Sequence, residues 1–193
     1  ANGAGSISYN NQTFLNNRGG GMSNEISSPS IVNTVFSENS ASFFSSGMYN
    51  SNSSSPSIVN TVFSRNSGTD GGGMYNGNFS SPSIVNTVFN GNKAGVGSGM
   101  YNSNSSSPNI VNTVFSGNEA TSSSGGIHNN NNNSPTIYNS VFYGNGSDIV
   151  NSASASTTGG SNFSEHYAET GFTALTADPF SDSANPIGAD GVW

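Results

Sequence analysis

The sequence predicts an all-β fold, a right-handed parallel β-helix with about 26 residues and three short strands in each coil. The first observation behind this prediction is a repeat, because similar segments begin at five prolines that are 27, 26, 26 and 27 residues apart. These prolines are Pro29, Pro56, Pro82, Pro108 and Pro135. The second observation is that the apolar runs in each unit are two to four residues long, which is too short for helices and suits strands. The third is that only two Leu are present, whereas a leucine-rich repeat of similar period needs Leu in its core.

The repeats extend over residues 1–164, and residues 165–193 show no repeat. A partial coil precedes Pro29, since Phe14 and Met22 stand where Phe36 and Met48 stand in the next unit. At the other end, residues 148–151 still match a strand of the earlier units. We expect residues 165–193 to close the helix or to lead to a downstream region.

Stacked coils place equivalent side chains above one another at about 4.8 Å, so the repeat predicts three inward columns of apolar side chains. Each buried side chain contributes roughly 1.5–3 kcal/mol to stability. The first column is Ile31, Ile58, Ile84, Ile110 and Ile137, the second is Phe36, Phe63, Phe89, Phe115 and Phe142, and the third is Met22, Met48, Met74, Met100 and Ile127.

Two columns of Asn follow the first and second strands of each unit. Asn tolerates the left-handed backbone of a sharp turn, and its amide can bond the copies above and below. We therefore interpret both columns as structural ladders rather than binding residues. They are Asn33, Asn60, Asn86, Asn112 and Asn139, and then Asn39, Asn66, Asn92, Asn118 and Asn145.

Charge is scarce, and this excludes several classes of partner. Only 7% of residues are charged, with three basic residues against ten acids and a net charge of −7. Nucleic acid is not an expected partner because phosphate binding needs clustered Lys and Arg. No apolar run is long enough for a transmembrane helix. Neither a metal site nor a cofactor is expected, since His128 and His166 lack ligands at suitable spacings apart from Glu165 beside His166.

The repeated Gly-Gly-Met-Tyr-Asn and Phe-x-x-Asn segments resemble the repeats of polymorphic outer-membrane-type proteins. They are also similar to right-handed β-helix repeats of bacterial secreted and surface proteins. The ending from Ala177 to Phe180 is similar to segments that close such helices. The resemblance implies secretion or display at the cell surface, and it implies no particular ligand.

Enzymes on this fold are chiefly polysaccharide lyases and hydrolases, which need convergent carboxylates or a cationic base. The acids within the repeats stand at different positions in their units, so no such set is expected. They are Glu25, Glu38, Asp70, Glu119 and Asp148. We therefore expect a non-enzymatic segment of an adhesin or surface stalk that presents a repetitive face to a glycan or a protein, with side-by-side self-association as a further expectation. Polysaccharide cleavage is the least favoured alternative.

Tyr49, Tyr75 and Tyr101 follow the inward Met column, so they should point outward in a row. Exposed aromatic rings can stack on sugars or anchor a protein partner. They can equally form a ladder that supports itself under the Ser-rich loops. These three tyrosines are the candidate ligand-binding residues, with both interpretations open.

The alternative function is ice binding by a flat, uncharged Thr and Val face. Its residues are Thr34, Thr61, Thr87 and Thr113, flanked by Val32, Val59, Val85 and Val111. Threonines in a row are also ordinary β-structure. The face requires that the turn at Asn33 does not bend the chain sharply, because otherwise Val32 and Thr34 would lie on different faces.

Overall fold

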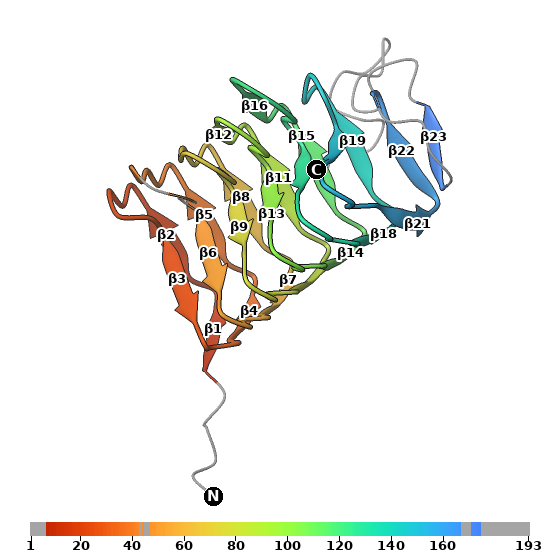
Figure 1. Cartoon of the computed structure of the whole chain (residues 1–193). Helices are drawn as coiled ribbons and strands as arrows, with labels where there is room; N and C mark the ends of the chain where they lie inside the picture. Colours follow the sequence, from red (N-terminus) through yellow and green to blue (C-terminus); the bar gives the residue numbers. More distant parts are fainter. Residues whose placement is uncertain (1–6, 43, 45–46, 167–170, 175–193) are drawn as a thin grey trace, which may run out of the picture.

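The computed structural model describes residues 7–42, 44, 47–166 and 171–174, and within these residues the chain is a parallel β-solenoid (Figure 1). Three sheets run along the stack of coils, and each coil contributes one strand to each sheet. The predicted all-β class and the stacking of coils about 26 residues apart are confirmed. The described part of the chain contains no helix that is long and apolar enough to cross a membrane.

Every strand is short, and the three sheets are named here in the order in which the chain visits them. Sheet A contains β1 (Ser8–Asn10), β4 (Ser30–Val32), β7 (Ser57–Val59), β10 (Ser83–Val85), β14 (Asn109–Val111), β18 (Thr136–Tyr138) and β21 (Thr158–Gly160). Sheet B contains β2 (Thr13–Leu15), β5 (Val35–Ser37), β8 (Val62–Ser64), β11 (Val88–Asn90), β15 (Val114–Ser116), β19 (Val141–Tyr143), β22 (Asn162–Ser164) and β23 (Phe172–Ala174). Sheet C contains β3 (Met22–Glu25), β6 (Met48–Ser51), β9 (Met74–Asn76), β13 (Met100–Asn102), β17 (Ile127–Asn129) and β20 (Ile149–Asn151). A two-stranded extension joins β12 (Lys93–Ala94) to β16 (Glu119–Ala120).

The register pairs each residue with its equivalent one coil away. Ile84 pairs with Ile58 and Ile110, and Phe89 pairs with Phe63 and Phe115. The partial first coil is in register too, because β1 pairs with β4 and β2 pairs with β5. After the clear repeats, β20, β21, β22 and β23 continue the three sheets. The C-terminal segment from residue 175, including Ala177 to Phe180, lies outside the described residues.

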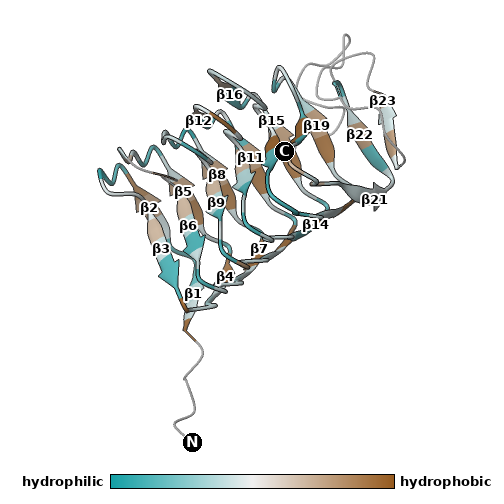
Figure 2. Ribbon diagram, viewed as in Figure 1, coloured by the Kyte–Doolittle hydropathy of each residue, from teal (hydrophilic) through white to brown (hydrophobic). Residues whose placement is uncertain are grey.

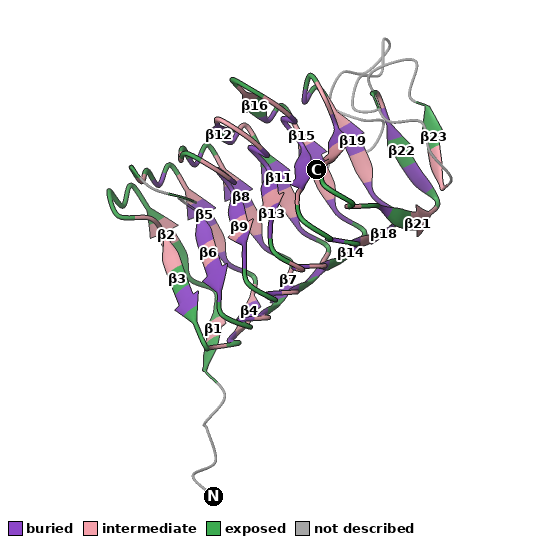
Figure 3. Ribbon diagram, in the orientation of Figure 1, coloured by how far each residue is buried: buried purple, intermediate pink, exposed green. Residues whose placement is uncertain are grey.

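The three apolar columns fill the interior as predicted, with Met22 in the first coil only partly buried, and Figure 3 shows buried segments on the strands of successive coils. From Phe14 to Phe142 the phenylalanine rings stack with centroids 4.7–4.8 Å apart and planes within 5° of parallel. Glycine before each Met makes room for the rings. A Cβ on Gly73 would lie 2.6 Å from the carbonyl oxygen of Gly99 and 2.9 Å from the Phe89 ring. The close packing of successive coils therefore explains the Gly in the Gly-Met-Tyr-Asn segment.

Both predicted Asn columns are ladders, but they turn the chain differently. Asn33 and its equivalents adopt the left-handed conformation with φ of 50–52°. At the second corner the left-handed residue is instead the one before the Asn, such as Glu38, Arg65 or Gly91. The Asn39 column is buried and bonds from coil to coil. The prediction that this second column supplies the left-handed turn residue is therefore wrong.

A third Asn ladder lies inside sheet C, and the sequence analysis did not identify it. Its side-chain amides donate to one another at 2.8–2.9 Å from coil to coil. Strand alternation explains the position, since Met points inward, Tyr outward and Asn inward again. The ladder consists of Asn24, Asn50, Asn76, Asn102, Asn129 and Asn151.

Candidate functional site

The threonines of the expected ice-binding face are inside the solenoid. Thr34, Thr61, Thr87 and Thr113 are 0–1% exposed, so the expectation that they form an exposed column is wrong. The physical reason is the left-handed Asn between Val and Thr, which bends the chain at this corner and points the Thr side chain inward. Each hydroxyl donates to the carbonyl oxygen of the Val two residues earlier, at 2.9–3.1 Å.

Outside this corner the chain presents valines and asparagines. We call this surface the A–B ridge, and it has an exposed Asn column at its crest with a half-buried Val column on each side. The crest is Asn33, Asn60, Asn86, Asn112 and Asn139, the sheet A flank is Val32, Val59, Val85 and Val111, and the sheet B flank is Val35, Val62, Val88, Val114 and Val141. Along the crest, Asn60 donates to Asn33 and Asn112 donates to Asn86, both at 3.2 Å.

Sheets A and B carry no charged side chain on any of their described strands. The charged residues of the neighbouring turns lie away from the ridge, where Arg65 pairs with Glu38 at 3.5 Å and Lys93 pairs with Glu119 at 2.8 Å. Figure 2 shows hydrophobic segments on strands such as β15 and β19 and hydrophilic segments both in the loops and on strands such as β3. The ridge is therefore a regular, neutral strip of amides and aliphatic groups.

The three candidate tyrosines lie together on the outside of sheet C, but both ring faces of Tyr75 and Tyr101 are occupied. Tyr49 stacks on Tyr75 and Tyr75 on Tyr101, with centroids 5.2 and 5.4 Å apart, and His128 continues the stack at 5.5 Å. Phe44 covers Tyr49 and Tyr75 from the side. The side chain of Asn130 donates to the Tyr101 hydroxyl at 3.2 Å. This geometry leaves ring edges rather than ring faces of Tyr75 and Tyr101 for a ligand.

Beside this stack, the partly buried Asp70 and the buried His128 interact electrostatically. Burial raises the pKa of the Asp70 carboxyl, and His128 partly opposes the rise. Burial lowers the pKa of His128, and Asp70 partly opposes the fall. The pKa of Tyr75 is raised by burial and then by its neighbours Tyr49 and Tyr101. Because Ser123 Oγ lies 3.2 Å from His128 Nδ1, the imidazole is held under the loop that precedes it.

An open hollow of about 310 Å³ lies on the same side, between residues 120–125 and 145–147. The turn at 145–147 is shorter than the loops of earlier coils. Ser, Thr, Gly, Ala and Asn line the hollow together with Val150, and no carboxylate or imidazole does so. The hollow offers hydrogen bonding without an acid or a base.

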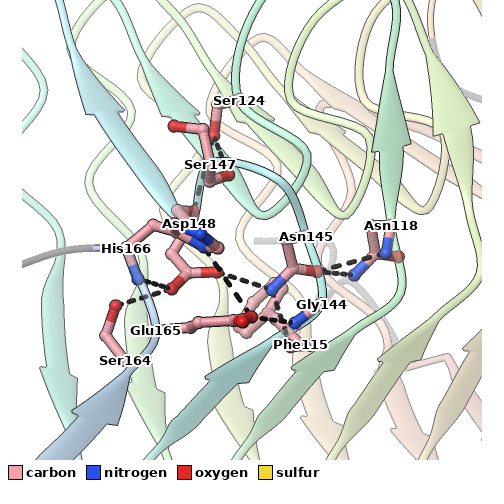
Figure 4. Close-up of polar contacts among 10 residues, drawn as sticks. All are labelled: Phe115, Asn118, Ser124, Gly144, Asn145, Ser147, Asp148, Ser164, Glu165 and His166. Atoms are coloured by element: carbon pink, nitrogen blue, oxygen red, sulfur yellow. Dashed lines mark hydrogen bonds and ion pairs between the residues drawn. The ribbon is translucent and has the colours of Figure 1, made fainter. Parts of the chain in front are cut away.

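One acidic residue, Asp148, is buried near the C-terminal end of the described coils. Asp148 is buried, and its carboxylate accepts hydrogen bonds from Asn145 at 2.9 Å, from the Ser164 hydroxyl at 2.7 Å and from the backbone of His166 at 2.8 Å (Figure 4). Glu165 accepts from the backbone N–H of Gly144 at 2.8 Å. All three donors to Asp148 belong to the chain itself, so this carboxylate joins the last coils. Apart from the position of Asp148 next to a strand, nothing in the repeat pattern indicates this role.

The described residues contain no group of three or more His, Cys, Asp or Glu that could hold a metal ion. Glu165 and His166 form a single exposed pair at 3.7 Å. Neither sheet A nor sheet B brings two acids together at its surface. What the described surface does bring together is the Asn and Val columns of the A–B ridge.

Comparison with known proteins gives no match to a family model, to a curated protein or to a solved structure. The fold itself defines the class, a parallel β-solenoid of about six turns. Within that class, arguments about function rest on the surface chemistry of the described coils.

Proposed function

We propose that the chain is a non-catalytic, rod-like segment of an extracellular or cell-surface protein, of adhesin or stalk type, that binds a neutral glycan along the A–B ridge. The observation that carries this proposal is the absence of charge from sheets A and B over all their described strands. The repeat pattern further supports membership of the bacterial secreted and surface β-helix type. The interior ladders supply the rigidity that such a segment needs.

The ridge fits a glycan better than the tyrosine stack does. Asn side chains offer both a donor and an acceptor, which match sugar hydroxyl groups, and the flanking valines offer apolar contact to the C–H faces of the rings. In the tyrosine stack Tyr75 and Tyr101 each lie between two neighbouring rings, so their ring faces are already in contact. A neutral glycan fits better than an acidic one because the ridge holds no cation.

A protein partner is less well supported. Over five coils the ridge is a strip of roughly 20 Å by 10 Å, or about 200 Å². A standard protein interface takes about 800 Å² from each partner. A linear glycan needs only such a strip.

The experiment is a glycan array and a set of turnover assays with the pure chain. Wild type should bind neutral glycans without shortening them. Val59→Lys and Val85→Lys place a charge and a long side chain on the ridge and should abolish the signal. Thr121→Lys adds the same side chain at an exposed position away from the ridge and serves as the control. The proposal fails if no neutral glycan binds, if the ridge variants bind like the control, or if a polysaccharide is depolymerised.

Ice binding is a second candidate, on different residues from those first expected. The observation in its favour is the regularity of the ridge, whose Val and Asn columns keep the register of the stacked strands. A preorganised neutral surface lowers the entropy cost of ordering a ligand against it. Wild type should then show thermal hysteresis or ice shaping at high micromolar concentration, and Val85→Tyr should remove it. Absence of both effects in wild type rejects this candidate.

A further inference from the structure

We infer that the A–B ridge ends in an aromatic subsite for one sugar ring, formed by Tyr138, Phe163 and Asn139. This inference rests on the proposed glycan binding and deepens it by naming the anchor. Before the corner, the flanking residue is Asn10 in the first coil, Val in the next four coils and Tyr138 in the coil after them. After the corner it is Val in five coils, and Phe163 then pairs with Val141. The two aromatic residues at these flank positions therefore lie in adjacent coils on opposite sides of one corner.

Both aromatic side chains are open to solvent, in contrast to the tyrosines of sheet C. Tyr138 is 46% exposed and Phe163 is 45% exposed. Neither ring stacks on another aromatic ring in the described part of the chain, whereas Tyr75 lies between two rings. A sugar ring can therefore approach a free aromatic face, whose negative potential attracts the polarised C–H groups of the sugar.

Gly160 keeps the space beside Tyr138 open. It pairs with Tyr138 in sheet A, so its side chain would point outward next to the ring. A Cβ there would lie 3.5–3.6 Å from two ring carbons of Tyr138. Tyr138 and Val141 belong to one coil, and Gly160 and Phe163 are their partners in the next coil. The two aromatic residues are therefore diagonal neighbours in this four-residue patch. We call the outward surface at Gly160, which carries no side chain beside the Tyr138 ring, the shelf.

Asn139 supplies the polar contact at this shelf. Its backbone N–H donates to the carbonyl oxygen of Gly160 at 3.1 Å, which fixes the corner against the next coil. Its side-chain amide is exposed and makes no hydrogen bond to another described residue. The amide can donate to one sugar hydroxyl and accept from its neighbour. Two aromatic rings and an unpaired amide, on strands that carry no charged side chain, together fit a neutral pyranose ring rather than an acidic sugar or a peptide.

The test measures binding to soluble neutral polysaccharides, with dextran, laminarin and xyloglucan as probes, by affinity electrophoresis and calorimetry. For the polysaccharide that wild type binds, Tyr138→Ala and Phe163→Ala should each weaken affinity at least tenfold. Gly160→Val should do the same while both rings remain, because its methyl groups fill the shelf. Val32→Ala, at the far end of the ridge, should change affinity less than threefold. Circular dichroism and thermal unfolding check that each variant keeps the fold.

The outcomes separate the two claims. If wild type binds one of these polysaccharides and all three shelf variants bind within threefold of it, the aromatic subsite is rejected and glycan binding by the ridge stands. If wild type binds none of the probes and no neutral glycan on the array, both claims are rejected. A loss with Tyr138→Ala and Gly160→Val but not with Val32→Ala supports the subsite.

Discussion

The side-chain amide of Asn92 donates a hydrogen bond of 3.0 Å to the side-chain oxygen of Asn118, one coil further along the solenoid. The same amide donates to the carbonyl oxygen of Phe63 at 2.9 Å, and the Asn92 side-chain oxygen accepts from the side chain and the backbone of Asn66. One buried side chain therefore joins three coils. A chain with so few charged residues and only three core columns depends on such ladders for its order.

Asn92→Ala should destabilise the fold by about 3 kcal/mol or more, because several buried donors and acceptors lose their partners at once. Chemical denaturation followed by circular dichroism measures this. Asn86→Gly is the matched control, since Asn86 is exposed with φ of 50°, a conformation that Gly adopts freely. The control should stay within about 0.5 kcal/mol of wild type. Equal losses in both variants would mean that burial of the amide is not what matters.

Phe89→Ala should cost about 3–5 kcal/mol, because it removes one ring from a continuous buried stack. Phe79→Ser is the control in the same coil. Phe79 is 67% exposed and has φ of 65°, and the equivalent position carries Ser53 and Ser105 in the neighbouring coils. Its replacement should be neutral or slightly stabilising. A loss of less than 1 kcal/mol for Phe89→Ala would contradict the description of the core.

Ile26→Asn should stabilise the chain by about 1 kcal/mol, because a β-branched residue is strained in the left-handed conformation. Ile26 has φ of 52° and is 84% exposed, so its replacement removes little buried apolar surface. The equivalent residues of later coils are Asn52, Asn78 and Asn104. The reciprocal change, Asn104→Ile, should destabilise by a similar amount. Thermal unfolding of both variants decides the sign, and a destabilised Ile26→Asn variant would show that Ile26 makes a contact that the strain argument omits.

His128 makes stability depend on pH in a defined direction. Burial lowers the pKa of His128, so the unfolded chain binds its proton more readily than the folded chain does. The stability contribution of neutral His128 is complete above about pH 6.5 and is lost as pH falls below that value. Asp70, whose pKa is raised, acts in the opposite direction at lower pH. Wild type should therefore lose more stability than His128→Gln between pH 8 and pH 5, and parallel pH profiles for the two proteins would contradict this.

The columns of Ile, Phe and Met could be predicted from the sequence because a fixed period and short apolar runs leave few other folds. The threonines could not be placed by alternation alone. Counting every second residue through Asn33 puts Val32 and Thr34 on one face, and only the left-handed φ at Asn33 separates them. The Asn50 ladder could have been predicted from the sequence, because Met48 points inward and Asn50 follows two residues later on the same strand.

The rest of the candidate site depends on contacts between residues far apart in the sequence. The stacking of His128 on Tyr101 follows from the repeat, but the cover that Phe44 provides comes from a loop without a period. The open shelf beside Tyr138 depends on the absence of a side chain at Gly160 in the following coil. No single repeat unit contains that information.

The most direct test of the central claim is an NMR titration of the wild-type chain with the neutral glycan that it binds, followed through backbone and Asn side-chain amide signals. We expect the perturbed signals to form one strip along the A–B ridge, with the side-chain amides of Asn86, Asn112 and Asn139 among them. Perturbations confined to Tyr75, Tyr101 and the loops above sheet C, or to the hollow at residues 120–125, would contradict it.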